Sequence, residues 1–424
     1  PLRSRHYNFV IKNDDGTTTD NQMEWRLGDV IHSSPITVNK PAENFHLIYR
    51  DPTYKDFVKR WSGRRTVVYF GANDGMLHAV NSGFYDDEDR QFYCSDGNQP
   101  DKSVCANDYN LGQELWAYVP YNLQPHLKCL ADRFYEHKYF VDLEPRIADV
   151  QIFPVDDDHP GGWGTILVGG MRFGGAPIAA EDLNNLDGSG DDEIHDLREF
   201  SSSYFVLDIT NPEKPKVLGE LTRTRDDSCV EDAACVDLNY TTSSPGIIVM
   251  RQDDGSTKWY LVLGNGPAEQ DGTNTVGKQG KVAILPLDRL IEKKAVRIPD
   301  QLPAATSEIG AFPVPFPDGD ETSASYISHF ISMDYNVELT AQDDLGARYR
   351  TDAVYFGTVD GTDFGQYSDE AVKSMYPAID DITSLGDQWY WNGGGRVFRL
   401  VTRKTDINGD EIASSPSQWT TAPN

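Results

Sequence analysis

Four short apolar runs that end in glycine recur along the chain. They are residues 67–71, 166–169, 260–264 and 353–357. Their β-branched and aromatic composition predicts buried strands that are closed by a turn. Each run is followed by a further predicted strand, and three of the runs are also preceded by one. The following strands are 76–80, 204–208, 281–285 and 396–401, and the preceding strands are 33–38, 145–150 and 243–249. The repeated unit is therefore a meander of at least three strands.

The four runs are spaced about 95 residues apart, roughly twice the length of a typical propeller blade. Either each unit spans two blades or its loops carry long insertions, and we expect both. Residues 113–119 predict an extra strand, whereas helical periodicity is scarce and indicates short helices only at 126–138 and 286–296. The predicted polar insertions are 84–110, 176–200, 222–237 and 362–388.

This pattern predicts an all-β fold, a modified β-propeller with long polar insertions. We expect one propeller domain over residues 1–424. A pair of β-sandwiches is the competing fold, and it is less well supported because sandwiches do not require internal repetition. The chain begins at Pro1 without an initiator Met or an apolar leader, so we interpret it as the C-terminal part of a longer secreted protein.

The charge of the chain is strongly acidic, with 38 Lys and Arg against 67 Asp and Glu and a net charge of −29. Such a charge repels nucleic-acid backbones and anionic membranes, which excludes a nucleic-acid function. Apolar residues make up 38% of the chain, and no stretch approaches the roughly 18 consecutive apolar residues that a membrane span needs. We therefore expect a globular protein that is not transmembrane.

Four of the five cysteines form two close pairs in polar segments, Cys94 with Cys105 and Cys229 with Cys235. This spacing suits disulfides that close loops in an oxidising compartment. Cys129 is left over, and it is either a small buried apolar side chain or bonded to a partner outside this chain.

The motifs that suggest enzymatic chemistry lack essential parts. Residues 272–279 approach a phosphate-binding loop, but Gln279 replaces the Ser or Thr that would hold Mg²⁺, and a strand is predicted to follow. H-E-x-x-H and G-x-S-x-G motifs are absent from the sequence. His78 and His329 lie in predicted strands, where a structural role is the simpler interpretation. We therefore expect no enzymatic activity.

Alternating carboxylates and amides predict calcium sites, because Ca²⁺ binds several oxygen ligands that a tight turn can supply. Three segments have this pattern. The first choice comprises Asp334, Asn336, Glu338, Asp343, Asp344 and Asp352; the second comprises Asp187, Ser189, Asp191 and Asp196; the third comprises Asp406, Asn408 and Asp410. The alternative explanation for each segment is simple turn formation in an acidic chain.

Five segments occur in a fixed order between residues 69 and 212. They are YFGANDGMLHAV at 69–80, ELWAYVP at 114–120, YFVD at 139–142, TILVGG at 165–170 and FVLDITNP at 205–212. Together they resemble the C-terminal domain of the PilY family of type IV pilus tip proteins. The resemblance implies a propeller of about seven blades, exposed at the pilus tip or the outer cell surface after export through the periplasm.

The same resemblance implies roles in pilus assembly and retraction, adhesion and surface sensing. It implies minor pilins and the pilus tip as partners, together with a host or abiotic surface. The calcium loop of the family, D-x-[DN]-x-D-x-x-x-D, maps onto Asp334, Asn336, Glu338 and Asp352. This chain differs in having Glu338 in place of the third aspartate and an insertion over 339–351, which brings Asp343 and Asp344 as further candidate ligands.

An alternative from another class is a quinone-dependent dehydrogenase. Residues 71–75 and 112–116 also resemble the tryptophan-docking repeats of quinoprotein propellers. Those enzymes commonly carry adjacent cysteines, which this sequence lacks. We therefore favour the interpretation that these repeats lock the blades together.

Overall fold

The computed structural model describes the chain in several stretches. They are residues 5–12, 17–25, 27–95, 101–103, 105, 109–181, 197–222, 238–251, 256–268, 279–292, 299–301, 310–314, 324–334, 349, 351–366, 389–401 and 420–423. These residues form two compact units, each described by itself below. The first unit comprises Pro1–Arg223 and Leu287–Gln301, and the second comprises Thr224–Pro286 and Leu302–Asn424.

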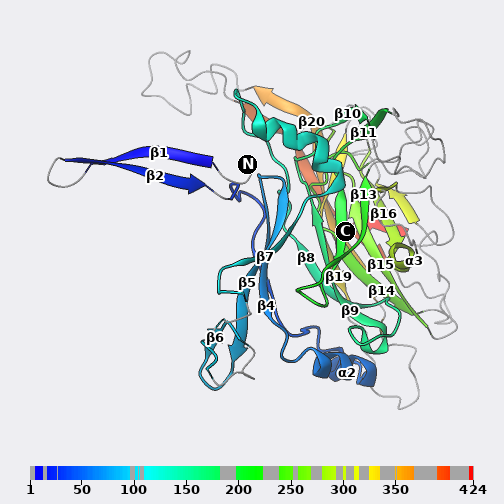
Figure 1. Ribbon diagram of the computed structural model, residues 1–424. Coiled ribbons are helices and arrows are strands. Elements are labelled where there is room, and N and C mark those ends of the chain that lie inside the picture. The colour runs from blue at the N-terminus through cyan, green and yellow to red at the C-terminus, as the bar shows by residue number, and fades with distance from the viewer. Residues whose placement is uncertain are drawn as a thin grey trace, which may run out of the picture. The chain divides into compact units, whose positions relative to one another are not determined.

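The first sheet of the first unit is an antiparallel meander. It contains β3 (Ile36–Val38), β4 (Thr66–Ala72), β5 (Met76–Asp86) and β7 (Glu114–Tyr118). The short strand β6 (Gln91–Tyr93) pairs with the far end of β5. Figure 1 shows β4, β5 and β6 along this blue part of the chain.

The second sheet of the first unit has the order β17-β13-β12-β9-β8. Its strands are β8 (Arg146–Gln151), β9 (Trp163–Gly170), β12 (Tyr204–Asp208), β13 (Lys216–Thr222) and β17 (Pro299–Gln301). Two separate ribbons complete the strands of this unit. They are β1 (Arg5–Lys12) with β2 (Thr18–Trp25), and β10 (Ile178–Glu181) with β11 (Leu197–Phe200).

The described helices are short, and all of them belong to the first unit. They are α1 (Phe45–Ile48), α2 (Pro52–Arg60), η1 (Tyr121–Ala131), η2 (Pro160–Gly162) and α3 (Asp288–Glu292). Helix α2 begins at Pro52 because the side chain of Asp51 accepts hydrogen bonds from the backbone N–H groups of Thr53 and Tyr54. Its buried residues, Tyr54 and Phe57, anchor the helix in the core.

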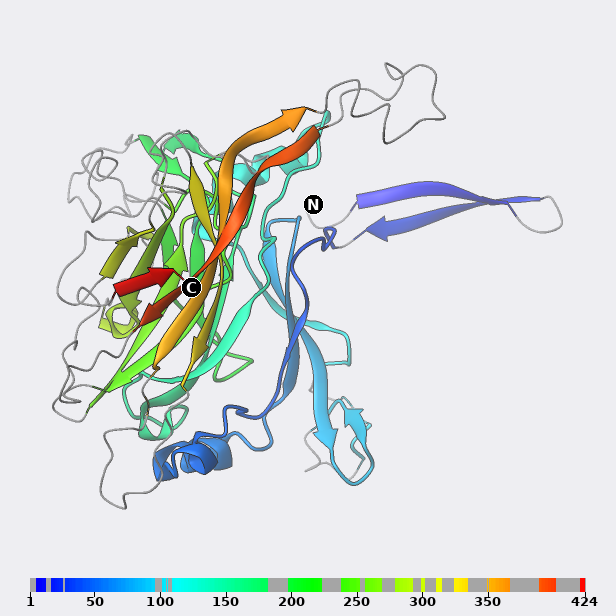
Figure 2. The same cartoon turned by 180° about the vertical axis from the view of Figure 1, so that it is seen from behind.

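The second unit contains two four-stranded antiparallel sheets. The first has β14 (Gly246–Arg251), β15 (Thr257–Gly264), β16 (Lys281–Pro286) and β18 (Gly310–Pro313). The second has β19 (Ser325–Met333), β20 (Ala353–Gln366), β21 (Trp389–Val401) and β22 (Thr420–Pro423). Figure 2 shows the long orange strands β20 and β21 running together.

Each unit has its own apolar core. In the first unit the core joins residues of both sheets, among them Tyr69, Leu167 and Phe205. In the second unit it joins β14, β15 and β16 to β19, β20 and β21. No side chain fits at Gly264, at the end of β15, because a Cβ there would lie 2.3 Å from the Cβ of Ile327 in β19. This close approach explains why the third apolar run ends in glycine.

The repeat analysis predicted the strands well. The four apolar runs form β4, β9, β15 and β20, the second strand of four different sheets, and each predicted following strand is the next strand of its sheet. The extra strand predicted at 113–119 is β7 and belongs to the first sheet. Each repeat of the sequence thus forms one large sheet. Among the described residues, the wide spacing of the repeats comes from long connections between strands. The all-β prediction is confirmed.

Several boundaries predicted from the sequence are wrong. Strand β5 continues to Asp86 and β20 continues to Gln366, into segments predicted as insertions. Helix α2 was not predicted, although Asp51 and Pro52 carry its start signal. The helix expected at 126–138 is instead the 3₁₀ segment η1, which ends at Ala131. None of the described helices is long and apolar enough to cross a membrane.

Candidate functional site

The predicted calcium ligands Asp334 and Asp352 lie at the same end of the β19–β20 hairpin. Met333, the last residue of β19, pairs with Ala353, the first residue of β20. The backbone N–H of Asp352 donates a hydrogen bond of 2.9 Å to the carbonyl of Met333. Asp334 directly follows the ladder and Asp352 directly precedes it, so the fold brings together two carboxylates that are 18 positions apart in the sequence.

This hairpin end is held on the neighbouring strand β14. The backbone N–H of Thr351 donates to the carbonyl of Val249 at 2.8 Å, and the N–H of Val249 donates to the Thr351 hydroxyl at 3.1 Å. On the other strand of the hairpin, the Ser332 hydroxyl donates to the carbonyl of Ile247. Asp352 is 1% exposed, so it lies in a buried, hydrogen-bonded part of the hairpin end.

The donor set at this end suits a hard cation, because carboxylate oxygens are ligands that Ca²⁺ prefers. Among the described residues, no group of three or more His, Cys, Asp or Glu side chains is arranged to hold a metal. The other first-choice residues, Asn336, Glu338, Asp343 and Asp344, lie outside the described residues. The second and third predicted sites also lie outside them, namely Asp187, Ser189, Asp191 and Asp196, and Asp406, Asn408 and Asp410. All three calcium sites therefore stay predictions.

The connection from β5 to β7 in the first unit is closed by its own residues. Cys94 and Cys105 form a disulfide, which confirms the first predicted pair. The ammonium group of Lys102 forms an ion pair with Asp86 and lies 5.5 Å from the ring centre of Tyr93. The second predicted pair, Cys229 with Cys235, lies outside the described residues. Cys129 is half-buried and has no disulfide partner in the described part of the chain.

His78 in β5 is a buried histidine with both ring nitrogens paired. Nε2 lies 3.1 Å from a carboxylate oxygen of Asp74, and Nδ1 lies 3.0 Å from one of Glu114. Burial opposes the charge on the ring, but the hydrogen bonds to Asp74 and Glu114 outweigh it and raise the pKa of His78. The structural role predicted for His78 is confirmed. Its two carboxylate partners were missed, because Glu114 meets His78 only through the pairing of β5 with β7.

Trp116 in β7 is the tryptophan of the second quinoprotein-like segment. Its indole N–H donates to the carbonyl of Pro212 at 2.8 Å, and its ring lies 5.6 Å from the ring of Tyr69. The side chain thus ties the outer strand of the first sheet to the turn that follows β12. This contact agrees with the interpretation that the repeat locks sheets together.

A second buried polar cluster surrounds Asp149 in β8. Its carboxylate accepts hydrogen bonds from the hydroxyls of Tyr54 at 2.7 Å and Thr165 at 2.6 Å. Burial and the neighbouring Asp149 raise the pKa of Tyr54. Arg64 donates to Thr165, and burial lowers the pKa of its guanidinium. Because these buried groups satisfy one another, the cluster stabilises the fold and offers no open catalytic group.

A family model described as the PilY1 beta-propeller domain matches residues 27–292. The chain belongs to this family. The match begins just after β2, ends at α3 and includes the His78 and Asp149 clusters, whereas Asp334 and Asp352 lie beyond it. Membership of the PilY1 family confirms the propeller fold class, and both the blade number and the single domain over 1–424 stay predictions.

Curated PilY1 proteins are similar to this chain. A type IV pilus biogenesis factor PilY1 homolog from Xylella fastidiosa (strain Temecula1) is 26% identical over 290 residues, which are 68% of this chain and 17% of the relative. The type IV pilus biogenesis factor PilY1 of Pseudomonas aeruginosa (strain PAK) is 29% identical over 261 residues, or 60% of this chain and 16% of the relative. The chain thus spans about a sixth of the length of these PilY1 relatives.

A solved structure is also similar, the crystal structure of the Pseudomonas aeruginosa PilY1 C-terminal domain. It shows 18% sequence identity and a TM-score of 0.41, and the alignment covers 90% of this chain and 49% of the solved chain.

Proposed function

We propose that this chain acts in type IV pilus biogenesis as a non-enzymatic propeller module. The observation that carries the proposal is the match to the PilY1 beta-propeller domain over 27–292, together with relatives that are named type IV pilus biogenesis factors. In this proposal the chain is exported through the periplasm and lies at the pilus tip or the outer cell surface. Minor pilins and a host or abiotic surface are its partners, and its roles are pilus assembly and retraction, adhesion and surface sensing.

Calcium is the proposed modulator of this module. Asp334 and Asp352 support the proposal, because the hairpin places both carboxylates at one end and anchors that end on β14. Asn336, Glu338, Asp343 and Asp344 would complete the oxygen ligands of the cation. A bound cation would hold the start and the end of the β19–β20 connection together, and a partner that contacts this connection would sense the change.

A complementation experiment tests both parts of the proposal. A strain that lacks the gene for this chain receives the full-length wild-type gene, the D334A/D352A variant, or D157A as a control that removes an exposed carboxylate elsewhere. The number of surface pili per cell and the rate of twitching motility are then measured. We expect the wild type and D157A to restore both, and the double variant to change the number of surface pili.

The outcomes separate the two parts. Normal piliation and motility without the gene would contradict the role in pilus biogenesis. Full restoration by D334A/D352A would leave that role standing and would contradict calcium modulation at this hairpin end.

A further inference from the structure

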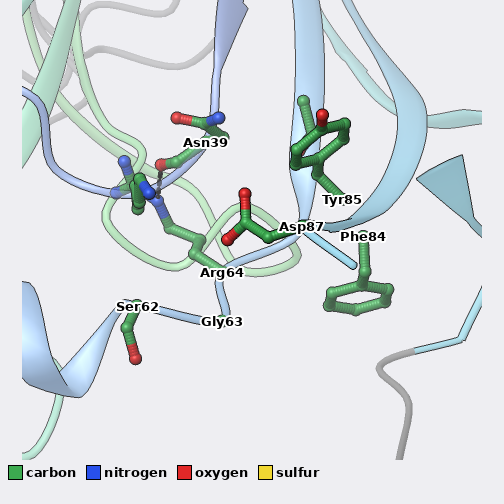
Figure 3. A pocket seen from close by; sticks show the side chains of 9 residues that line it. Asn39, Ser62, Gly63, Arg64, Phe84, Tyr85 and Asp87 are labelled. Carbon is green, nitrogen blue, oxygen red and sulfur yellow. Dashed lines mark hydrogen bonds between the residues drawn. The ribbon is translucent and has the colours of Figure 1, made fainter. Parts of the chain in front are cut away.

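A small pocket lies in the first unit where three segments meet. Its lining comes from the end of β3, the turn between α2 and β4, and the outer half of β5. The volume is about 120 Å³, and the lining residues are Asn39, Lys40, Ser62, Gly63, Arg64, Thr66, Phe84, Tyr85 and Asp87. Figure 3 shows Asn39, Arg64 and Asp87 around the same space.

The buried part of this pocket contains one polar side chain with hydrogen-bond partners and one without. Arg64 is 7% exposed and donates through Nε to the carbonyl of Asn39, which fixes the chain beside Lys40. Thr66 is 1% exposed, and its hydroxyl has no hydrogen-bond partner among the described residues. A buried hydroxyl without a partner is costly, and a hydrogen bond from a bound molecule would remove that cost once a rotation about χ1 of Thr66 turned the enclosed oxygen toward the pocket.

The aromatic wall of the pocket depends on a bend in β5. Thr66 pairs with Gly83, and the register shifts by one residue directly after this pair. Gly83 has a φ of +78°, and a Cβ there would lie 2.1 Å from the carbonyl oxygen of Tyr93, so only glycine fits. The bulge and the glycine re-aim β5 and carry Phe84 and Tyr85 to the pocket.

The two aromatic residues are held from outside the pocket. The guanidinium of Arg65 lies 4.6 Å from the ring centre of Phe84. The ring of Tyr85 lies 5.1 Å from that of Phe92, and both rings remain exposed, at 46% and 44%. Both aromatic residues are thus packed against a neighbour, and Tyr85 leaves an accessible aromatic surface at the rim.

The charges at the rim point to the class of ligand. Lys40 can donate hydrogen bonds to a ligand, Asp87 can accept them, and Asn39, Ser62 and Thr66 can do both, whereas Arg64 contributes its charge. An anion would meet Asp87 and the −29 charge of the chain, whereas a cation would meet Lys40 and Arg64. A neutral ligand with several hydroxyl groups matches all of these side chains, since each hydroxyl both donates and accepts.

From this geometry we propose that the pocket binds one residue of a neutral sugar. The volume of about 120 Å³ is somewhat below that of a cavity of about 150 Å³ that holds benzene, so one edge of a sugar ring would enter the pocket and the rest would lie at the exposed rim beside Tyr85 and Asp87. The sugar hydroxyls bond to Thr66, Asp87 and Lys40, and the apolar face of the ring lies against Tyr85. This inference rests on the pocket and does not depend on a role in pili.

Saturation-transfer NMR on the full chain tests the proposal with methyl glycosides of glucose, galactose, mannose and N-acetylglucosamine. Galacturonate and glucosamine serve as the charged comparisons. We expect transfer from at least one neutral glycoside, with a Kd of about 1 mM. Thr66→Val and Asp87→Asn should each weaken binding about tenfold, because the first removes a hydroxyl and the second replaces a charged acceptor with a weaker neutral one.

Two matched variants control for nonspecific effects. Asp86→Asn makes the same charge change one residue away, at a carboxylate that pairs with Lys102 and does not line the pocket. Thr66→Ser keeps the hydroxyl. Both should bind like the wild type. Absence of transfer from every neutral glycoside, equal binding by D87N and the wild type, or stronger binding of galacturonate would each overturn the proposal.

Discussion

Two long connections in this molecule are closed in different ways. The one from β5 to β7 carries the disulfide between Cys94 and Cys105 and the ion pair between Lys102 and Asp86. The one from β19 to β20 begins at Asp334 and ends at Asp352, two carboxylates at one end of a hairpin. The first connection is thus cross-linked by its own residues. The second has acidic residues at both of its ends.

The difference has an electrostatic consequence. Glu338, Asp343 and Asp344 lie in the sequence between Asp334 and Asp352, so residues 334–352 carry five carboxylates against the two guanidinium groups of Arg348 and Arg350. Like charges within a few ångströms repel one another, and a divalent cation relieves that repulsion. Because the disulfide already closes the first connection, we expect it to be insensitive to calcium and the second to depend on the cation.

The largest effect should be the loss of calcium binding in the D334A/D352A variant. The two substitutions remove the carboxylates that the hairpin positions, so the corresponding heat in a calorimetric calcium titration should disappear. The control is D157A, which should titrate like the wild type. Unchanged stoichiometry in the double variant would place the cation elsewhere and remove the contrast between the two connections.

A smaller effect is expected when the first connection is opened. The C94S/C105S variant should lower the free energy of unfolding by about 2–3 kcal/mol, because the disulfide closes a short loop in the unfolded chain. Denaturant unfolding measures this change, with C129S as the control for loss of a thiol. The calcium titration should be the same in C94S/C105S and the wild type, and a shifted titration would show that the two connections are not independent.

The smallest effect concerns pH, and the pH dependence of stability at His78 runs opposite to that of calcium binding. The pKa of His78 is raised above its ordinary value of 6.5, so its pairing with Asp74 and Glu114 stabilises the folded state fully below about pH 6.5. That contribution is lost as the pH rises through the raised pKa. The stability difference between the wild type and H78Q should therefore shrink from pH 6 to pH 8 in denaturant unfolding. A pH-independent difference would show that His78 does not bridge Asp74 and Glu114 in the charged form.

Calcium binding should follow the opposite trend, because its carboxylate ligands must be deprotonated. Calcium affinity should fall as the solution is acidified, over the range in which the His78 contribution is fully present. Calorimetric calcium titrations of the wild type at pH 5 and pH 7 measure this change, and equal affinities would contradict binding by carboxylates.

The sequence predicted the local features of both connections. The apolar runs and the following strands were found because a buried strand leaves a dense β-branched and aromatic pattern. The Cys94–Cys105 disulfide and the placement of Asp334 and Asp352 were found because both depend on residues that lie at the two ends of one loop.

Features that depend on distant pairing were not predictable from the sequence. The partners of His78 and the pocket at Thr66 require β5 to pair with β4 and β7 in one particular register. The bend at Gly83 was missed because the strand was predicted to end at Val80, although a glycine inside a strand often marks a bulge. Helix α2 was missed for another reason: Asp51 and Pro52 signal its start, but nine residues are too few for clear periodicity.

Hydrogen exchange with and without calcium tests the central claim most directly. The claim is that calcium orders the connection between Asp334 and Asp352 while the sheets stay folded. Chelation should speed exchange in peptides that cover 334–352 and leave 66–70 and 260–263, within β4 and β15, as protected as before. Equal exchange in 334–352 with and without calcium would contradict the claim.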